Sequence, residues 1–249
     1  MRKYVKLTWA TAMLCVDAIE AAYDQSQVLF GTSLTVLKGE VVALMGRNGM
    51  GKTTTVHCIV GLLHPSVGSI TFDGHRLNGL PPYRIARFGI GLVPEGRQVF
   101  PTLSVHENLV ATSANYGALS DPWTLDKVYE LFPQLKVRTT QLAGTLSGGE
   151  QQMLAIGRAL MLSPKLIILD EATEGLAPLI RDEIWSCLCK LKKLGHSILL
   201  IDKNLDELAP IAERGYVMEK GRIVWEGTTA ALMNDEKLKE VYLGLSKTS

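Results

Sequence analysis

The sequence lacks the features that mark several common classes of protein. Its 249 residues include only four cysteines without repeated C-x-x-C spacing, so neither a zinc site nor a disulfide framework is indicated. Cysteine usage of this kind is typical of reduced thiols in the cytosol. Lys and Arg number 26 and Asp and Glu 25, so no basic surface for nucleic acid is expected.

The chain also lacks a hydrophobic run suited to crossing a membrane. The longest stretch without a formal charge, residues 53–72, is interrupted by proline and by several polar side chains. Residues 7–16 are uncharged and follow basic residues, which imitates an export signal, but acidic residues follow at once and no small-x-small cleavage site appears. We therefore expect residues 1–13 to be an N-terminal extension and residues 247–249 a short tail.

What the sequence does contain is an alternation of short apolar runs and helical patterns. Three runs rich in Val, Ile and Leu predict strands buried on both faces of a largely parallel sheet: residues 41–45, 166–170 and 197–202. Helical patterns cover residues 52–63, 150–162 and 179–194. Shorter strands beside turns, at 69–72 and 222–225, predict an antiparallel part.

This pattern predicts an α/β fold of mostly parallel sheet with an antiparallel β subdomain. Few strand signals occur in the middle of the chain, so a helical subdomain is expected at about residues 82–144. An apolar fraction of 47% is ample for a sizeable core and excludes a disordered chain.

A phosphate-binding loop follows the first apolar run. The pattern G-x-x-x-x-G-K-[ST] is matched by Gly46, Arg47, Asn48, Gly49, Met50, Gly51, Lys52 and Thr53. Backbone N–H groups of such a loop turn towards phosphates. The helix that follows, with Thr54 in its first turn, presents its positive N-terminus to them. We expect Lys52 to reach the β- and γ-phosphates of ATP and the Thr53 hydroxyl to hold Mg²⁺. The strand before the loop and the helix after it favour this P-loop NTPase core over a chance glycine loop.

Two acidic residues end the second apolar run. Ligands of open α/β sheets lie beyond the carboxyl ends of the strands, so Asp170 and Glu171 should both face the site. Asp170 suits a water-mediated contact with Mg²⁺, and Glu171 suits the general base that deprotonates the attacking water. The alternative is that an acid in this position only caps the next turn.

A third motif begins a helix. Ser147 as N-cap and Glu150 three residues later predict a capping box, and Gly148 and Gly149 leave N–H groups open to an anion. With the P-loop before it and the acidic pair after it, this Leu-Ser-Gly-Gly-Glu segment resembles the signature of the ATP-binding cassette (ABC) ATPases. The resemblance covers about residues 14–246, which we take as one ABC ATPase domain.

The resemblance implies a site shared between two subunits. Members of the family enclose two ATP molecules head to tail, so the segment from Ser147 to Glu150 is expected to bind ATP held by a partner's P-loop. The partner would be a second ABC ATPase subunit, in a heterodimer or a homodimer. Tyr23 matches the aromatic residue that stacks on adenine, although an ordinary tyrosine at a strand end is the alternative.

One branch of the family is matched more closely. Residues 93–101, Val-Pro-Glu-Gly-Arg-Gln-Val-Phe-Pro, look like the ATPase subunit of branched-chain amino acid importers. The resemblance implies two membrane permeases, an external solute-binding protein reached indirectly, no nucleic acid, and a peripheral location on the cytoplasmic face of the inner membrane. Glu95 would stand where a glutamine usually senses Mg²⁺ and signals to the permease; a solvated loop acid is the alternative.

Three residues depart from the family pattern. Ala172 follows the expected base in place of proline, Glu174 adds a charge to the same loop, and Lys203 stands where most members have a switch histidine. Lysine keeps a donor and adds a full charge, so we expect Lys203 to lie near the γ-phosphate and contribute to catalysis; a side chain that extends into solvent without a role is the alternative. A catalytically weak regulatory subunit is one alternative. A soluble ABC protein outside transport is another, but the long insertions or tandem cassettes of such proteins are missing.

Overall fold

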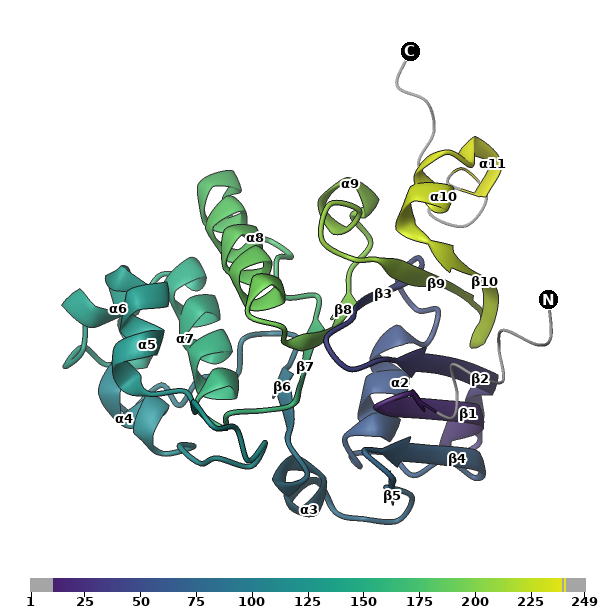
Figure 1. Ribbon diagram of the computed structural model, residues 1–249, viewed down its shortest axis with the longest axis horizontal. Coiled ribbons are helices and arrows are strands. Elements are labelled where there is room, and N and C mark those ends of the chain that lie inside the picture. The colour runs from purple at the N-terminus through teal and green to yellow at the C-terminus, as the bar shows by residue number, and fades with distance from the viewer. Residues whose placement is uncertain (1–10, 239, 241–249) are drawn as a thin grey trace.

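A six-stranded sheet forms the centre of the computed structural model, which describes residues 11–238 and 240 (Figure 1). The strand order is β10-β9-β3-β8-β7-β6. β3 (Val41–Met45), β8 (Ser197–Ile201), β7 (Leu166–Asp170), β6 (Ile90–Val93) and β9 (Arg214–Glu219) are parallel. β10 (Arg222–Thr228) closes one edge antiparallel to β9. The predicted mostly parallel sheet is confirmed, and its three predicted strands coincide with β3, β7 and β8.

A second sheet is wholly antiparallel and has the order β2-β1-β4-β5. Its strands are β1 (Leu14–Tyr23), β2 (Ser26–Val36), β4 (Val67–Phe72) and β5 (His75–Arg76). The strand expected at residues 69–72 belongs to this sheet, whereas the one expected at 222–225 is the antiparallel edge of the main sheet. This arrangement confirms the predicted antiparallel β part.

The core has two layers because the main strands are buried on both faces. Val42, Leu44 and Ile168 pack with the antiparallel sheet and with α2 (Lys52–Ile59). Their neighbours in sequence, such as Ala43 and Ile167, pack on the opposite face, mainly against helices. Alternate residues of one strand thus serve different layers, which is why these runs are continuously apolar.

The helices on the second face form most of the lobe at the left of Figure 1. They are α4 (Val105–Val110), α5 (Leu125–Leu131), α6 (Pro133–Val137), the 3₁₀ turn at Ala143–Thr145, α7 (Gly148–Leu160) and α8 (Pro178–Lys193). The shorter helices elsewhere are α3 (Pro82–Arg87), α9 (Leu205–Leu208), α10 (Thr229–Met233) and α11 (Glu236–Leu238). No helix among the described residues is long and apolar enough to span a bilayer.

One strand lies where sequence reasoning expected the helical subdomain. The structure places residues 90–93, as β6, in the main sheet beside β7, and not in a helical subdomain of residues 82–144. β6 has only four residues and follows Gly89, so its period-2 signal is too short to recognise. Of the expected extension, residues 1–10 lie outside the described residues, and Met13 donates its N–H to Val36. The expected tail, 247–249, also lies outside them.

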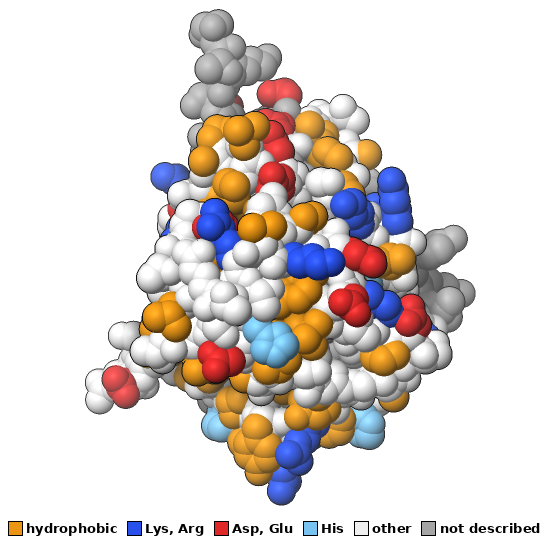
Figure 2. Space-filling view, turned by 90° about the vertical axis from the view of Figure 1, so that its left-hand side faces the viewer, with side chains coloured by type: hydrophobic (Ala, Val, Ile, Leu, Met, Phe, Trp, Pro, Cys, Tyr) orange, Lys and Arg blue, Asp and Glu red, His pale blue; other side chains and the backbone are white. Residues whose placement is uncertain are grey.

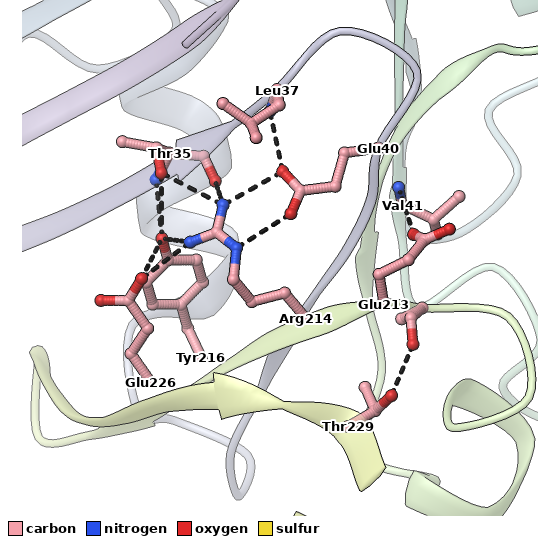
Figure 3. A network of polar contacts seen from close by, with 10 residues as sticks. Thr35, Leu37, Glu40, Val41, Glu213, Arg214, Tyr216, Glu226 and Thr229 are labelled. Atoms are coloured by element: carbon pink, nitrogen blue, oxygen red, sulfur yellow. Dashed lines mark hydrogen bonds and ion pairs between the residues drawn. The ribbon is translucent and has the colours of Figure 1, made fainter. Parts of the chain in front are cut away.

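A charged network fastens the two sheets together (Figure 3). From β9, Arg214 makes an ion pair with Glu40 at 2.9 Å and donates to the Thr35 carbonyl of β2 at 2.9 Å. Its guanidinium also contacts Tyr216 and Glu226. The side chains of Arg214 and Glu40 are only 16% and 12% exposed, so neither could be left alone at low cost.

We therefore expect Arg214→Met to lower the free energy of unfolding by about 3 kcal/mol, because Glu40 would keep its charge without a cation beside it. Urea denaturation measures this. Arg222→Met, which removes an exposed arginine bonded to the Phe30 carbonyl, is the matched control and should cost less than about 1 kcal/mol. Equal costs for the two variants would contradict the role of the network.

Candidate functional site

The loop between β3 and α2 has the backbone shape that a phosphate cradle needs. Gly46 has φ 148° and Gly51, at the N-cap of α2, has φ 103°. A Cβ on Gly46 would lie 2.4 Å from the Met218 carbonyl oxygen, so no other residue fits without movement. Met50 accepts the Gly221 N–H at 2.9 Å, which braces the loop against the turn between β9 and β10.

The Lys52 side chain points into this loop and is 4% exposed. Its Nζ donates to the Gly46 carbonyl at 3.0 Å and to the Arg47 carbonyl at 3.3 Å. The same ammonium is 3.2 Å from Glu171 Oε1. The structure thus brings the lysine of the first motif together with the expected base of the second. The chain then enters α2, whose first turn contains Thr53 and Thr54.

Asp170 is the last residue of β7 and lies beside Thr53. It is 2% exposed, and burial raises the pKa of its carboxyl, while the neighbouring Thr53 hydroxyl acts in the opposite direction. Its Oδ1 has no hydrogen-bond partner among the described residues. A buried carboxylate oxygen without a partner is costly, and it is the kind of atom that a hard cation such as Mg²⁺ binds.

Glu171 begins the loop that leads from β7 to α8. Its φ of 48° is unusual for a residue with a side chain, and its N–H donates to the Ile201 carbonyl at 2.9 Å. Burial raises the pKa of Glu171, a bond with Glu174 adds to the rise, and Lys52 opposes it. Carboxylate oxygens of Glu95, Glu171 and Glu174 lie within 4.8 Å of one another. Glu95, which follows β6, therefore reaches the same edge of the sheet.

The helix start at Ser147 lies on the other face of the main sheet from α2 (Figure 1). The predicted capping box is confirmed: the Ser147 hydroxyl accepts the Glu150 N–H at 3.3 Å, and Glu150 Oε2 accepts the Ser147 N–H at 2.8 Å. The guanidinium of Arg97 covers Gly148: a Cβ at position 148 would lie 2.6 Å from Arg97 Nη1. Sequence reasoning does not single out this arginine.

Two further predicted residues have partners that the sequence does not reveal. Tyr23, at the end of β1, is 44% exposed, and its hydroxyl is 2.9 Å from Nδ1 of His57 on α2. The ammonium of Lys203 lies 2.6 Å from Glu174 Oε1. Two of the departures from the family pattern are thus paired with each other. Only the adjacency of β7 and β8 in the sheet, which sequence does not give, could have shown it.

A cavity of about 940 Å³ lies away from these residues. It is bordered by Lys38, Lys165 and His196, which precede β3, β7 and β8. It therefore opens at the amino edge of the sheet, whereas the predicted residues gather at the carboxyl edge.

Comparison with known proteins agrees with this geometry. Residues 29–174 match the family described as ABC transporter. The chain is 45% identical over 232 residues to the high-affinity branched-chain amino acid transport ATP-binding protein BraG of Pseudomonas aeruginosa, covering 93% of this chain and 100% of the relative. It is 36% identical to the lipopolysaccharide export system ATP-binding protein LptB of Haemophilus influenzae, covering 94% and 98%.

Other similarities support the same assignment. The chain is 32% identical to the probable branched-chain amino acid transport ATP-binding protein LivF of Archaeoglobus fulgidus, covering 94% of this chain and 99% of the relative. The crystal structure of a nucleotide-free ATP-binding cassette from an ABC transporter matches with a TM-score of 0.80 and 27% identity, covering 95% and 100%.

The chain therefore belongs to the ABC transporter family. It has the cassette fold of these ATPases and is an ATP-binding and ATP-hydrolysing transport subunit, as the resemblance had implied.

The burial of Asp170 predicts a pH-dependent cost to stability. An acid whose pKa is raised by folding weakens the fold once it ionises, so this loss develops as pH rises above about 3.9 through the raised value. Without nucleotide or divalent cations, Asp170→Asn should raise the thermal midpoint at pH 7, and the gain should vanish in acid. Asp182→Asn, at an exposed site on α8, should change little. A variant less stable than wild type at pH 7 would contradict this account.

Proposed function

We propose that the chain hydrolyses Mg²⁺-bound ATP at the carboxyl edge of the main sheet and powers an importer of branched-chain or related amino acids. The observation that carries the site is the 3.2 Å ion pair between Lys52 and Glu171, which joins two motifs separated by more than a hundred residues. The cargo is proposed from the 45% identity to BraG over nearly the whole chain.

In this proposal the backbone of residues 46–51 surrounds the phosphates, and Lys52 supplies the positive charge that they need. Lys52 exchanges its two loop carbonyls for phosphate oxygens, which accept hydrogen bonds from an ammonium more strongly. Tyr23 offers an exposed ring for the adenine at the end of β1.

The donor set around Asp170 fits Mg²⁺. Thr53, Glu95 and Asp170 offer a hydroxyl and carboxylate oxygens, the ligands that this ion prefers, directly or through water. The ion, when bound, neutralises charge that develops on the phosphates. The partnerless Oδ1 of Asp170 supports this assignment.

Glu171 is the proposed general base. Its raised pKa makes the carboxylate a better proton acceptor near neutral pH, and Lys52 and the Ile201 carbonyl fix its position. The attacking water gives one proton to this carboxylate as its oxygen bonds to the γ-phosphorus, while the bond from that phosphorus to the β,γ-bridging oxygen breaks and ADP leaves.

A complete site needs a second subunit in this proposal. The P-loop and the segment from Ser147 to Glu150 belong to opposite faces of one sheet, so the latter would serve ATP held by another cassette. The proposed partner is a second ABC ATPase subunit, in a heterodimer or a homodimer.

The proposed membrane partners are two permeases, with a solute-binding protein beyond them, and the chain would lie on the cytoplasmic face of the membrane. We place the docking surface on Glu95 and the helical lobe. The lobe and its approach carry exposed apolar side chains, among them Phe100, Val137 and Leu142. Figure 2, which faces this side of the molecule, shows hydrophobic groups interspersed with charges of both signs.

Glu171→Gln should keep ATP bound and slow its hydrolysis about 10²–10⁴-fold, because the amide preserves shape but cannot accept a proton. Single-turnover hydrolysis and nucleotide binding, measured together, test this. Glu183→Gln, which alters a carboxylate on α8, is the control. An unchanged rate for Glu171→Gln would place the base elsewhere.

The transport proposal is tested with the assembled complex in lipid vesicles. ATP-dependent uptake of labelled leucine, isoleucine or valine is expected, and Lys52→Ala should abolish it, whereas Lys193→Ala, an exposed lysine, should not. The similarity to LptB gives the second candidate, lipopolysaccharide export. A complex that extracts lipopolysaccharide and takes up no amino acid would favour that alternative.

A further inference from the structure

We propose that Glu174 is a positioning residue of the hydrolytic site, whose carboxylate holds the Lys203 ammonium beside Glu171. The two residues would then work as a pair, and position 203 would depend on position 174. This inference rests on the proposed role of Glu171 as the base.

The contact arises from the neighbouring strands. β7 and β8 are adjacent and parallel, so the loops that follow them, residues 171–177 and 202–204, leave the sheet at the same edge. A second contact fixes these loops, because the Thr173 hydroxyl donates to Asp202 Oδ2 at 2.9 Å in a buried position. Glu174 and Lys203, the next residue of each loop, therefore begin from fixed positions.

The ion pair with Glu174 restricts the position of the Lys203 ammonium. Its ammonium sits on a flexible four-carbon stem, and an exposed lysine samples many positions. Glu174 accepts from Lys203 at 2.6 Å, and this bond raises the pKa of Lys203, so the ammonium stays charged and localised. The Glu174 N–H donates to the Glu171 carbonyl at 3.2 Å, which brings the held cation next to the proposed base.

Positive and negative side chains alternate along the carboxyl edge of the sheet, and the alternation depends on both Glu174 and Lys203. The carboxyl groups of Glu171 and Glu174 lie together and share a hydrogen bond, which adds to the effect of burial in raising the pKa of Glu171. Lys52 forms an ion pair with Glu171 on one side, and Lys203 forms an ion pair with Glu174 on the other. Among the described residues, Glu95 belongs to the same cluster of carboxylates, and Asp202 acts on the Lys203 ammonium.

A simple stabilising contact would behave differently. The side chains of Lys203 and Glu174 are 52% and 41% exposed, and ion pairs with that exposure contribute little to stability. A purely structural role therefore predicts no effect on kcat. A positioning role predicts a loss in kcat with an unchanged KM for ATP, since an interaction that strengthens only in the transition state leaves ground-state binding intact.

The test is steady-state ATP hydrolysis by the assembled transporter, with any different second ATPase subunit disabled at its own P-loop lysine. We expect Glu174→Gln and Lys203→Met each to lower kcat about tenfold, with KM within about twofold. The double variant should be no slower than either single variant, because both remove the same held cation. Lys192→Met, which breaks a 2.8 Å ion pair at the other end of α8, is the control.

Lys203→His supplies the decisive comparison. A histidine ring has two rotatable bonds and a fixed donor direction, so it needs no carboxylate to hold it. We expect Glu174→Gln to leave kcat unchanged in the Lys203→His background. The inference is overturned if Glu174→Gln lowers kcat equally in the Lys203 and Lys203→His backgrounds, or if it lowers kcat in neither. An inactive Lys203→His chain would also overturn it. If Glu171→Gln lowers the rate of hydrolysis and Glu174→Gln does not, only this inference is contradicted. If Glu171→Gln leaves the rate unchanged, the proposed site itself is contradicted.

Discussion

The arrangement of the site depends on the parallel hydrogen bonding of β8 to a strand on each side. Ile201, at the end of β8, is paired with Leu44 of β3 and with Asp170 of β7. All three strands therefore end at one level, and the chain leaves each of them into a loop of the proposed site. No helix or turn could align the phosphate loop, the buried acid and Lys203 in this way, because only parallel strands bring their carboxyl ends to one edge.

Sequence reasoning predicted the parts of the fold whose signals are local. The three buried strands and the capping box at Ser147 were recognisable because continuous apolar runs and cap residues act over a few positions. β6 was missed because four residues after a glycine carry no distinct period. The P-loop was placed correctly between its strand and its helix, since its glycines are required by backbone conformation and by the close approach of Met218.

What the sequence could not provide was pairing across the sheet. Glu174 and Lys203 were each noticed as unusual, but their contact depends on β7 and β8 being neighbours, and strand order is not encoded locally. The same holds for the Lys52–Glu171 pair and for the bond between Tyr23 and His57. Departures from a family pattern are thus better judged as sets that meet in space than as single substitutions.

The brace between Met50 and the β9–β10 turn has a consequence for how the protein is made. The Lys220 N–H contacts the Met50 sulfur and the Gly221 N–H bonds the Met50 carbonyl, so the phosphate loop is supported by residues 170 positions later in the chain. During synthesis, residues 46–53 are therefore made about 170 residues before the turn that supports them. A nascent chain that stops before residue 220 has the complete sequence of residues 46–53 without the turn that supports it.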